Sequence, residues 1–291
     1  MRLLILSDVH ANPWALDAVG RDAGAVDHIL CAGDCVNYGL APGIVVGWLR
    51  EHGAIAVRGN HDHAVAFHAD PRASPAKQAL ALAMRDWTRR QLGDDDLLWL
   101  TRLPVSLHWE LDGTRFVITH ATPLEPLYDY RLTPELRDAM LDKIIGHLEA
   151  DVLIVGHTHL PMMRRHGRLS IVNPGSVGQP LDGDPRASYA IWEDGRVTLR
   201  RVQLLGESVE HERPAYAHRL QPLHKLPRLE EMLFFRRAKP AHLGIAVKEM
   251  QFHLTRLRGL SFDRLIVERE ARAFDHTIQR SHDQTEITRP L

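Results

Sequence analysis

The sequence has little cysteine and no long apolar run. Its 291 residues include only Cys31 and Cys35, which cannot form a disulfide framework and favour a reducing compartment. The spacing of these two residues is a weak zinc signal, and we expect Cys31 to be a buried strand residue. No stretch approaches the roughly 20 apolar residues of a membrane span, and the first apolar run is interrupted by Asp8 and His10, unlike a signal peptide. We therefore expect a cytoplasmic protein.

The sequence also lacks an excess of charge of either sign. Its 36 Lys and Arg residues oppose 37 Asp and Glu residues, so no global field steers the protein toward nucleic acid or an anionic membrane. The hydrophobic fraction of 44% is enough for a core, in one large domain or in a domain with an appendage. Histidine, by contrast, is abundant at 19 residues, and a metal site would use several of them.

Apolar runs that resemble strands alternate with helical segments near the N-terminus. We expect strands at 2–7, 26–32 and 54–57, with helices at 12–24 and 41–52 between them. This β-α-β-α-β alternation is typical of an α/β fold with parallel strands.

The remaining chain favours helices first and strands later. We expect helices at 75–91, 94–101 and 133–149, hairpins at 105–119 and 187–202, and strands at 151–155 and 168–172. A mostly β second half beside a β-α-β first half predicts two sheets face to face, with helices outside. After residue 203 prolines interrupt the pattern, and we expect helices at 241–257 and 261–279. The chain is therefore divided into a catalytic domain at 1–203 and a partly helical C-terminal appendage at 204–291.

Five of the apolar strand-like runs end in residues that can bind metal. In chain order these residues are Asp8 and His10, then Asp34, then Asn60 with His61 and Asp62, then His120, and finally His157 with His159. Each alone has an ordinary structural explanation, such as a turn asparagine or a surface histidine. Ligands collect beyond the carboxyl ends of strands in α/β sheets, however, so the five ends together indicate a two-metal hydrolytic centre.

These motifs, in this order, resemble the signature of the calcineurin-like metallophosphoesterases. The signature segments are Asp8-x-His10, Gly33-Asp34, Gly59-Asn60-His61-Asp62, His120 and Gly156-His157-x-His159. Segments 7–12, 57–65 and 173–190 resemble more closely a small bacterial and archaeal phosphodiesterase-like subgroup. The resemblance covers about residues 1–203 and implies a four-layer α-β-β-α sandwich of two mixed sheets.

The resemblance also implies a role for each residue of the centre. Asp34 would bridge two cations. Asp8, His10 and His159 would complete the first metal site, and Asn60, His120 and His157 would complete the second. Such mixed ligands suit borderline divalent ions, with manganese expected first and iron, zinc, nickel or cobalt as alternatives. His61, oriented by Asp62, would act as general acid, while a hydroxide held by the ions attacks phosphorus in line.

The implied activity is hydrolysis of a small-molecule phosphodiester or phosphomonoester. Asn37 and Tyr38 either face the substrate or serve the fold. Protein phosphatases of the superfamily usually have Asp-Arg at these positions, so the sequence argues against a protein phosphatase and less firmly against a dinucleoside-polyphosphate hydrolase. A non-catalytic scaffold of the same fold is the alternative from another class, although every ligand position is filled here. The loop at 173–180 either lines the site or forms a tight packing turn.

The appendage contains one segment with a candidate partner. Residues 229–237 place an apolar cluster beside basic residues, which is typical of a membrane-surface element, of a subunit-docking element and also of a helix packed on its own domain. A homo-oligomer is compatible with this segment. No basic stripe indicates nucleic acid, and no clear membrane signal is present.

Overall fold

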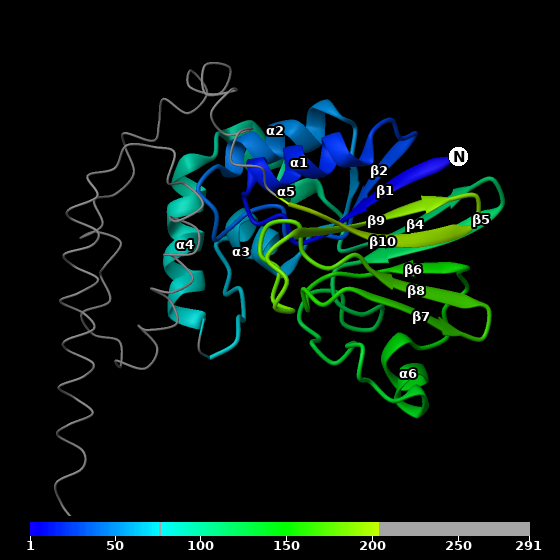
Figure 1. The fold of residues 1–291 in the computed structure, drawn as a ribbon. Helices are drawn as coiled ribbons and strands as arrows, with labels where there is room; N and C mark the ends of the chain where they lie inside the picture. The colour runs from blue at the N-terminus through cyan, green and yellow to red at the C-terminus, as the bar shows by residue number, and fades with distance from the viewer. Residues whose placement is uncertain (76, 204–291) are drawn as a thin grey trace, which may run out of the picture. The chain divides into compact units, whose positions relative to one another are not determined.

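The computed structural model describes residues 1–75 and 77–203, which contain two mixed five-stranded sheets (Figure 1). In spatial order the first sheet contains β10 (Arg196–Val202), β9 (Ala187–Glu193), β1 (Arg2–Leu6), β2 (His28–Cys31) and β3 (Ile55–Ala56). The second contains β4 (Ser106–Leu111), β5 (Thr114–Thr119), β6 (Val152–Ile154), β8 (Leu169–Asn173) and β7 (Met162–His166). Strands β1 to β3 are mutually parallel, as are β5, β6 and β8, and the other pairings are antiparallel.

Alternate residues of β1 belong to different cores. Leu3 and Ile5 point between the two sheets, where they join Phe116 of the second sheet. Leu4 and Leu6 point the other way and join the core beneath α1 (Pro13–Ala23) and α2 (Pro42–Glu51). Both faces of the strand are apolar because both are covered, which explains the continuous hydrophobic run in the sequence.

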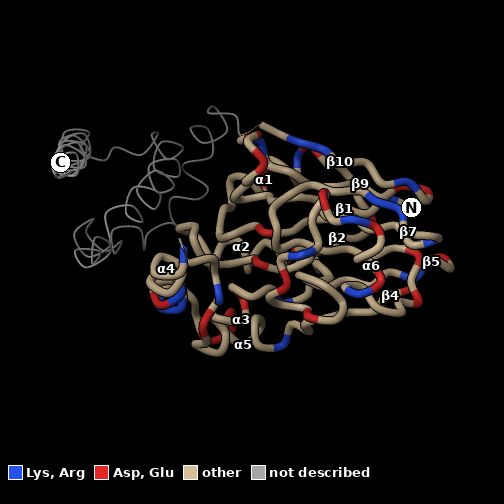
Figure 2. The backbone as a smooth tube through the Cα atoms, turned by 90° about the horizontal axis from the view of Figure 1, so that it is seen from below, with Lys and Arg blue, Asp and Glu red and all other residues tan. Residues whose placement is uncertain are grey.

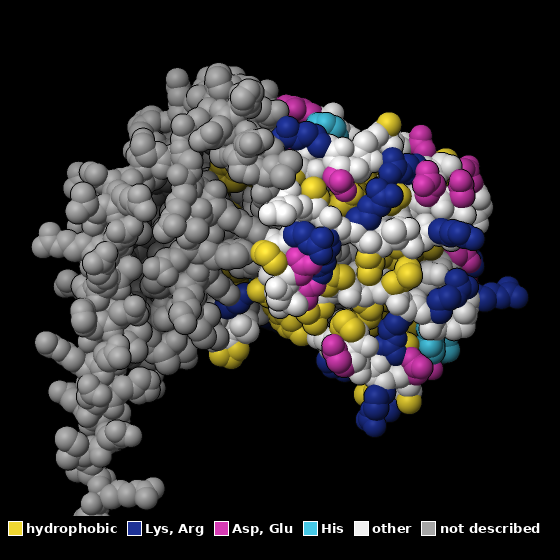
Figure 3. All heavy atoms as spheres, viewed as in Figure 1, with side chains coloured by type: hydrophobic (Ala, Val, Ile, Leu, Met, Phe, Trp, Pro, Cys, Tyr) yellow, Lys and Arg dark blue, Asp and Glu magenta, His cyan; other side chains and the backbone are white. Residues whose placement is uncertain are grey.

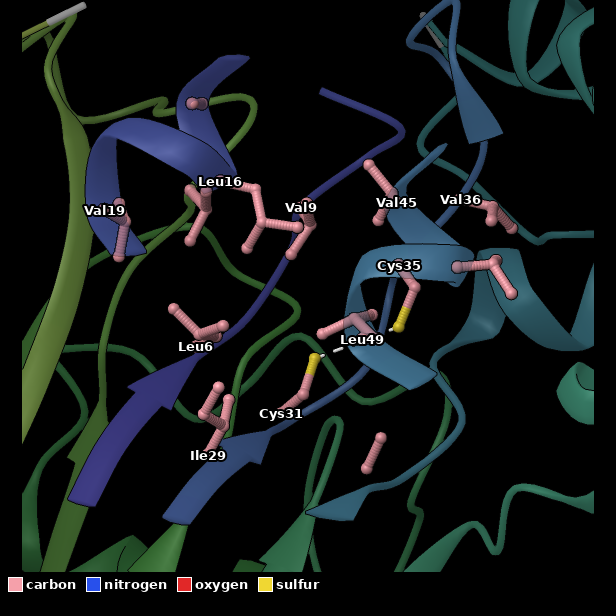
Figure 4. Packing of buried hydrophobic residues seen from close by; sticks show 14 of the residues in the cluster. Leu6, Val9, Leu16, Val19, Ile29, Cys31, Cys35, Val36, Val45 and Leu49 are labelled. Carbon is pink, nitrogen blue, oxygen red and sulfur yellow. Dashed lines mark hydrogen bonds between the residues drawn. The ribbon is translucent and has the colours of Figure 1, made fainter. Parts of the chain in front are cut away.

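Helices cover the outer face of each sheet. Cys31 and Cys35 are buried on the first sheet beneath α2, with their sulfur atoms 3.8 Å apart (Figure 4). Cys31 is thus a buried strand residue, as the sequence predicts. On the second sheet, Leu141 and Ile144 of α6 (Asp138–Ile145) pack against Leu153. The predicted α-β-β-α sandwich is confirmed.

Helix α3 (Asn60–Phe67) was not expected from the sequence, which favours a turn there. Its eight residues carry no apolar stripe of helical period, because one side contributes polar residues to the site while Ala64 and Val65 are buried. The Asp62 carboxylate accepts the Gly59 amide at 3.0 Å and so satisfies one free N–H at the start of this helix. Helices α4 (Gln78–Gln91) and α5 (Asp94–Arg102) lie close to their predicted ranges.

Strand β7 was also missed, because its Met-Met-Arg-Arg-His sequence resembles a polar loop. The strand lies at the edge of the second sheet, where charged residues are common. Helix α6 is shorter than the predicted 133–149: it starts five residues later and ends before Gly146, whose φ is 65°.

The predicted helices at 241–257 and 261–279 and the segment at 229–237 lie outside the described residues. The appendage at 204–291 lies outside them too, and the domain boundary at 203 stays a prediction. Of the helices within 1–75 and 77–203, none has both the length and the apolar character needed to cross a membrane.

Both charge signs are interspersed on the described surface. In Figure 2 basic and acidic residues lie side by side on α4, for example. Exposed pairs include Arg50 with Asp96 at 3.1 Å and Arg115 with Asp151 at 3.2 Å. Such pairs contribute little to stability because water screens them. Hydrophobic side chains also gather in the middle of the face shown in Figure 3.

Candidate metal centre

The carboxyl ends of the parallel strands in both sheets lead into one buried group of polar side chains. Loops after β1, β2 and β3 contribute from the first sheet, and loops after β5 and β6 contribute from the second. None of the seven predicted ligands is more than 7% exposed: Asp8, His10, Asp34, Asn60, His120, His157 and His159. The structure brings all seven together, and their role as ligands stays a prediction.

Three of these side chains form a first group. The Nε2 atoms of His10 and His159 lie 3.2 Å apart. Oδ1 of Asp8 lies 3.3 Å from Nε2 of His159 and 3.9 Å from Nε2 of His10. Three donor atoms from two sheets therefore surround one point.

Three others form a second group. Oδ1 of Asn60 lies 3.1 Å from Nε2 of His120 and 3.1 Å from Nδ1 of His157, and the two nitrogens are also 3.1 Å apart. The Asn60 amide nitrogen donates to the carbonyl of Pro71 at 2.7 Å. This bond turns the Asn60 carbonyl oxygen, the atom able to bind a cation, toward the histidines.

Asp34 lies between the two groups. Its Oδ2 is 3.8 Å from Nε2 of His10 in the first group and 3.2 Å from Nε2 of His120 in the second. Its Oδ1 accepts the backbone amide of His61 at 2.9 Å. The carboxylate is thus fixed where it could serve both groups.

Three of the four histidines among the predicted ligands are oriented through their second ring nitrogens. Nδ1 faces a backbone carbonyl in His10 (Val36, 3.3 Å), His120 (Ala32, 2.7 Å) and His159 (Gln179, 2.6 Å). A carbonyl only accepts, so in the neutral ring Nδ1 carries the hydrogen and Nε2 offers a lone pair.

In their neutral forms, His10 and His159 point these lone pairs at each other and at the Asp8 carboxylate, which is unfavourable unless a cation lies among them. Asp8 Oδ1 is buried and has no hydrogen-bond partner among the described residues, although Ser7 Oγ and the His157 amide both donate to Oδ2. An unpartnered carboxylate oxygen beside convergent imidazole nitrogens fits a divalent ion.

Electrostatics keep the carboxylates in the form that binds cations. Burial alone would raise the pKa of Asp8, but the neighbouring His159 lowers it to about 2. The pKa of Asp34 is likewise well below its usual range, because His120 and His61 outweigh burial.

The pKa values of two buried histidines shift in opposite directions. Burial lowers the pKa of His157 to about 3, whereas the charges of Asp34 and Asp8 outweigh burial and raise the pKa of His120 to about 10. A proton on His120 compensates the buried carboxylates, and a bound metal ion would replace it.

The backbone at the centre is strained. Five of the seven residues have φ in the left-handed region, between 46° and 68°: Asp8, His10, Asp34, His157 and His159. Residues other than glycine seldom adopt this conformation, and it costs of order 1–3 kcal/mol each. Such strain typically marks a functional site.

Two glycines allow the strand ends to approach closely. A Cβ on Gly59 would overlap Asp34 Oδ1, and a Cβ on Gly156 would overlap Ser7 Oγ. The glycines that precede Asn60 and His157 are therefore required by close packing around the centre.

His61 lies beside the first group, but its ring partner is Asn37. The amide nitrogen of Asn37 is 2.7 Å from Nδ1 of His61, and burial lowers the pKa of His61 to about 4. The sequence suggested that Asp62 orients this ring. Asp62 instead accepts the backbone amides of Val36 at 3.1 Å and Gly59 at 3.0 Å, so it joins the loop after β2 to α3. Burial, reinforced by Asp34, raises the pKa of Asp62 to about 7.

Asn37 and Tyr38 are both buried. Asn37 has no exposed surface, and its side chain contacts His61. It therefore lies next to a predicted catalytic residue but is not exposed to solvent. The Tyr38 ring lies 4.7 Å from that of His61 and 5.1 Å from that of His10. A contact between Tyr38 and substrate stays a prediction.

The loop at 173–180 supports the ligand loops from behind. Ser176 donates to the carbonyl of Asp8 at 2.7 Å, Asn173 donates to that of Gly156 at 2.8 Å, and the Gln179 carbonyl faces His159. The loop is therefore a packing turn that also positions the centre. The sequence identified this loop as a feature of the family subgroup but predicted no role for Asn173, Ser176 or Gln179.

Comparisons with known proteins point to one family. Residues 1–194 match the family described as the calcineurin-like phosphoesterase superfamily domain. An uncharacterized protein of Methanocaldococcus jannaschii is 30% identical over 221 residues, 69% of this chain and 87% of that protein. Phosphodiesterase YfcE of Escherichia coli K12 is 29% identical over 210 residues, 67% and 88% of the two chains. The crystal structure of a metallophosphoesterase from Sphaerobacter thermophilus is 34% identical and covers 75% of this chain and 95% of its own, with a TM-score of 0.59.

Proposed function

The chain belongs to the calcineurin-like phosphoesterase superfamily and is a metal-dependent phosphoester hydrolase, and we propose that it cleaves small-molecule phosphodiesters with two divalent transition-metal ions. The observation that carries the proposal is the position of Asp34 between two groups of donor atoms, 3.8 Å from His10 and 3.2 Å from His120. The likeness to the phosphodiesterase YfcE supports a diester as the substrate class.

The seven side chains divide into two ligand sets. One ion would be held by Asp8, His10 and His159. The other would be held by Asn60, His120 and His157, and Asp34 would bind both ions. When bound, two such ions polarise the phosphoryl oxygens and activate water for attack on phosphorus. We propose manganese as the physiological ion, with iron, zinc, nickel and cobalt as competitors for the same mixed donors.

His61 acts on the leaving group through its Nε2–H. Because Asn37 donates to Nδ1, a neutral His61 ring carries its hydrogen on Nε2. We assign to this hydrogen a hydrogen bond that stabilises the charge developing on the departing alkoxide. The predicted role of general acid requires the imidazolium form, which becomes a neutral ring when its Nε2 proton moves to the leaving oxygen. Asp62 contributes indirectly, by holding the start of α3 and the loop after β2.

The test is turnover of bis(p-nitrophenyl) phosphate and p-nitrophenyl phosphate by full-length protein loaded in turn with each of the five metals. We expect two bound ions per chain and faster hydrolysis of the diester, with manganese most active. An Asp34→Ala protein treated identically provides the background rate. A wild-type protein that hydrolyses neither ester with any metal would contradict the proposal. Cytoplasmic location and self-association stay predictions.

A further inference from the structure

Two loops meet beside the second group of donors, and each contacts one of its members. In the first loop, the Pro71 carbonyl accepts the side-chain amide of Asn60 at 2.7 Å. In the second, the ring of Tyr130 lies against the ring of His157, with centroids 3.7 Å apart and planes inclined by 32°. The position of both loops is therefore tied to the candidate metal ligands.

A cation–π contact joins these loops. The guanidinium of Arg72 lies over the ring of Tyr128, 4.5 Å from its centroid. The Arg72 backbone amide is held by Asp70 at 2.7 Å, and the same carboxylate oxygen accepts Gln78 at 2.6 Å. The backbone of Arg72 is thus held in place by Asp70, and its guanidinium is stacked on Tyr128.

The N–H groups of Arg72 are available to a ligand. The residue is exposed, and within residues 1–75 and 77–203 its guanidinium forms no ion pair. Arg58, another arginine of this region, is already engaged, because it donates to the Thr101 carbonyl at 3.0 Å and stacks on Phe67. Arg72 is therefore a cation next in sequence to Pro71, the residue that holds Asn60, and it has N–H groups that can bind an anion.

The Tyr130 side chain is partly exposed. One face of its ring covers His157, yet the residue is 44% exposed, and its hydroxyl has no hydrogen-bond partner in the described part of the chain. Its loop is held firmly: the Arg131 side chain donates two hydrogen bonds to Asp129, at 2.8 and 2.7 Å, and Thr122 donates to Asp129 at 3.3 Å. A ring held in this way can stack on another ring at little entropic cost.

We propose that Arg72 and Tyr130 form a substrate subsite, in which Arg72 binds a phosphoryl oxygen and Tyr130 stacks on a planar organic group of a phosphodiester. The inference rests on the proposed function. A guanidinium matches the geometry of phosphate oxygens, and stacking accepts either an aryl ring or a nucleobase. Protein phosphatases of the superfamily usually have an arginine at the position of Tyr38, and in this chain Arg72 would supply the positive charge instead.

The test compares three diesters that all release p-nitrophenol: bis(p-nitrophenyl) phosphate, thymidine 5′-(p-nitrophenyl) phosphate and methyl p-nitrophenyl phosphate. We expect Arg72→Ala to raise KM about tenfold for all three, since a charged hydrogen bond is lost. Tyr130→Leu lowers kcat/KM by about tenfold more for a diester with a second ring than for the methyl ester. The diester with the greater loss shows whether the subsite takes an aryl ring or a nucleobase.

Two controls accompany these variants. Tyr130→Phe keeps the ring and retains the preference for the ring-containing diesters. Arg168→Ala removes an exposed arginine in the turn before β8, at the opposite end of the sheet from the centre, and leaves all three reactions unchanged. Metal content is measured for every protein, because Tyr130 contacts a candidate ligand.

The outcomes separate the subsite from the proposed function. Wild-type turnover with unchanged kinetics in Arg72→Ala and Tyr130→Leu would overturn the subsite and leave the proposed function standing. A wild-type protein without turnover overturns both. Loss of metal from Tyr130→Leu, together with normal KM in Arg72→Ala, would make Tyr130 a support for His157 and would also overturn the subsite.

Discussion

The side-chain amide of Asn37 lies 2.7 Å from Nδ1 of His61 and determines which ring nitrogen carries the proton. The orientation of the amide is itself fixed, since its oxygen accepts the Tyr38 amide at 3.0 Å and its nitrogen lies 3.3 Å from the Ala81 carbonyl. The nitrogen must therefore donate, Nδ1 must accept, and a neutral His61 presents Nε2–H to the centre.

The first prediction concerns this pair. Asn37→Ala removes the donor and leaves His61 free to adopt either tautomer, so we expect kcat for the diester to fall about tenfold or more while KM and metal content change little. His61→Ala should lower kcat further, by about a hundredfold, with both metals retained. Steady-state kinetics and metal analysis measure these quantities.

A double-variant cycle tests whether Asn37 acts through His61. If it does, Asn37→Ala adds nothing once His61 is already alanine, because the two effects are not additive. Fully additive losses would show that Asn37 acts independently, for example by shaping the loop. Loss of metal from His61→Ala would contradict the assignment of His61 as a residue outside the ligand sets.

The second prediction concerns the bridging carboxylate. Asp34→Ala should bind fewer ions than any other single ligand variant, because both groups share Asp34. His159→Ala removes a member of the first group alone, so we expect it to retain about one ion per chain. Elemental analysis of dialysed proteins gives the counts. Two retained ions in Asp34→Ala would refute the bridging role.

The sequence located the centre because its chemistry follows a regular rule. Strand-end positions in parallel sheets converge, and residues such as Asp8, Asp34 and His157 could be recognised from the apolar runs before them. The same rule could not assign the partner of His61. Asp62 is adjacent in sequence, but α3 turns its carboxylate toward the backbone of Val36, and Asn37 arrives from another loop.

Features that depend on irregular loops were not predictable. Arg72 and Tyr130 lie in segments without periodicity, and only the tertiary structure ties Pro71 to Asn60 and Tyr130 to His157. Strand β7 was missed for a related reason: an edge strand with a charged outer face lacks the apolar run that identifies the central strands.

The third prediction is that metal binding stabilises the fold. Without cations, facing lone pairs and buried carboxylates oppose the close approach of groups such as His10 and His159. At a free metal concentration a thousandfold above Kd, one ion stabilises the native state by about 4 kcal/mol, which raises Tm by roughly 10 °C for a domain of this size. Calorimetry before and after chelation measures the shift. An identical Tm with and without metal would contradict a built-in cation site.

The last prediction uses two glycines with opposite surroundings. Gly156 leaves no room for a side chain, because a Cβ there would overlap Ser7 Oγ and press on Asp8. Gly156→Ala should therefore lower the free energy of unfolding by about 1–3 kcal/mol and reduce metal binding at the first site.

Gly47, within α2, has open space around it, and Gly47→Ala should raise the free energy of unfolding by about 0.5–1 kcal/mol through helix propensity, with metal content unchanged. Denaturant midpoints and metal analysis compare the two proteins directly. If Gly156→Ala were as stable and as metal-loaded as Gly47→Ala, the close packing of the loop after β6 against the end of β1 would not be what positions Asp8.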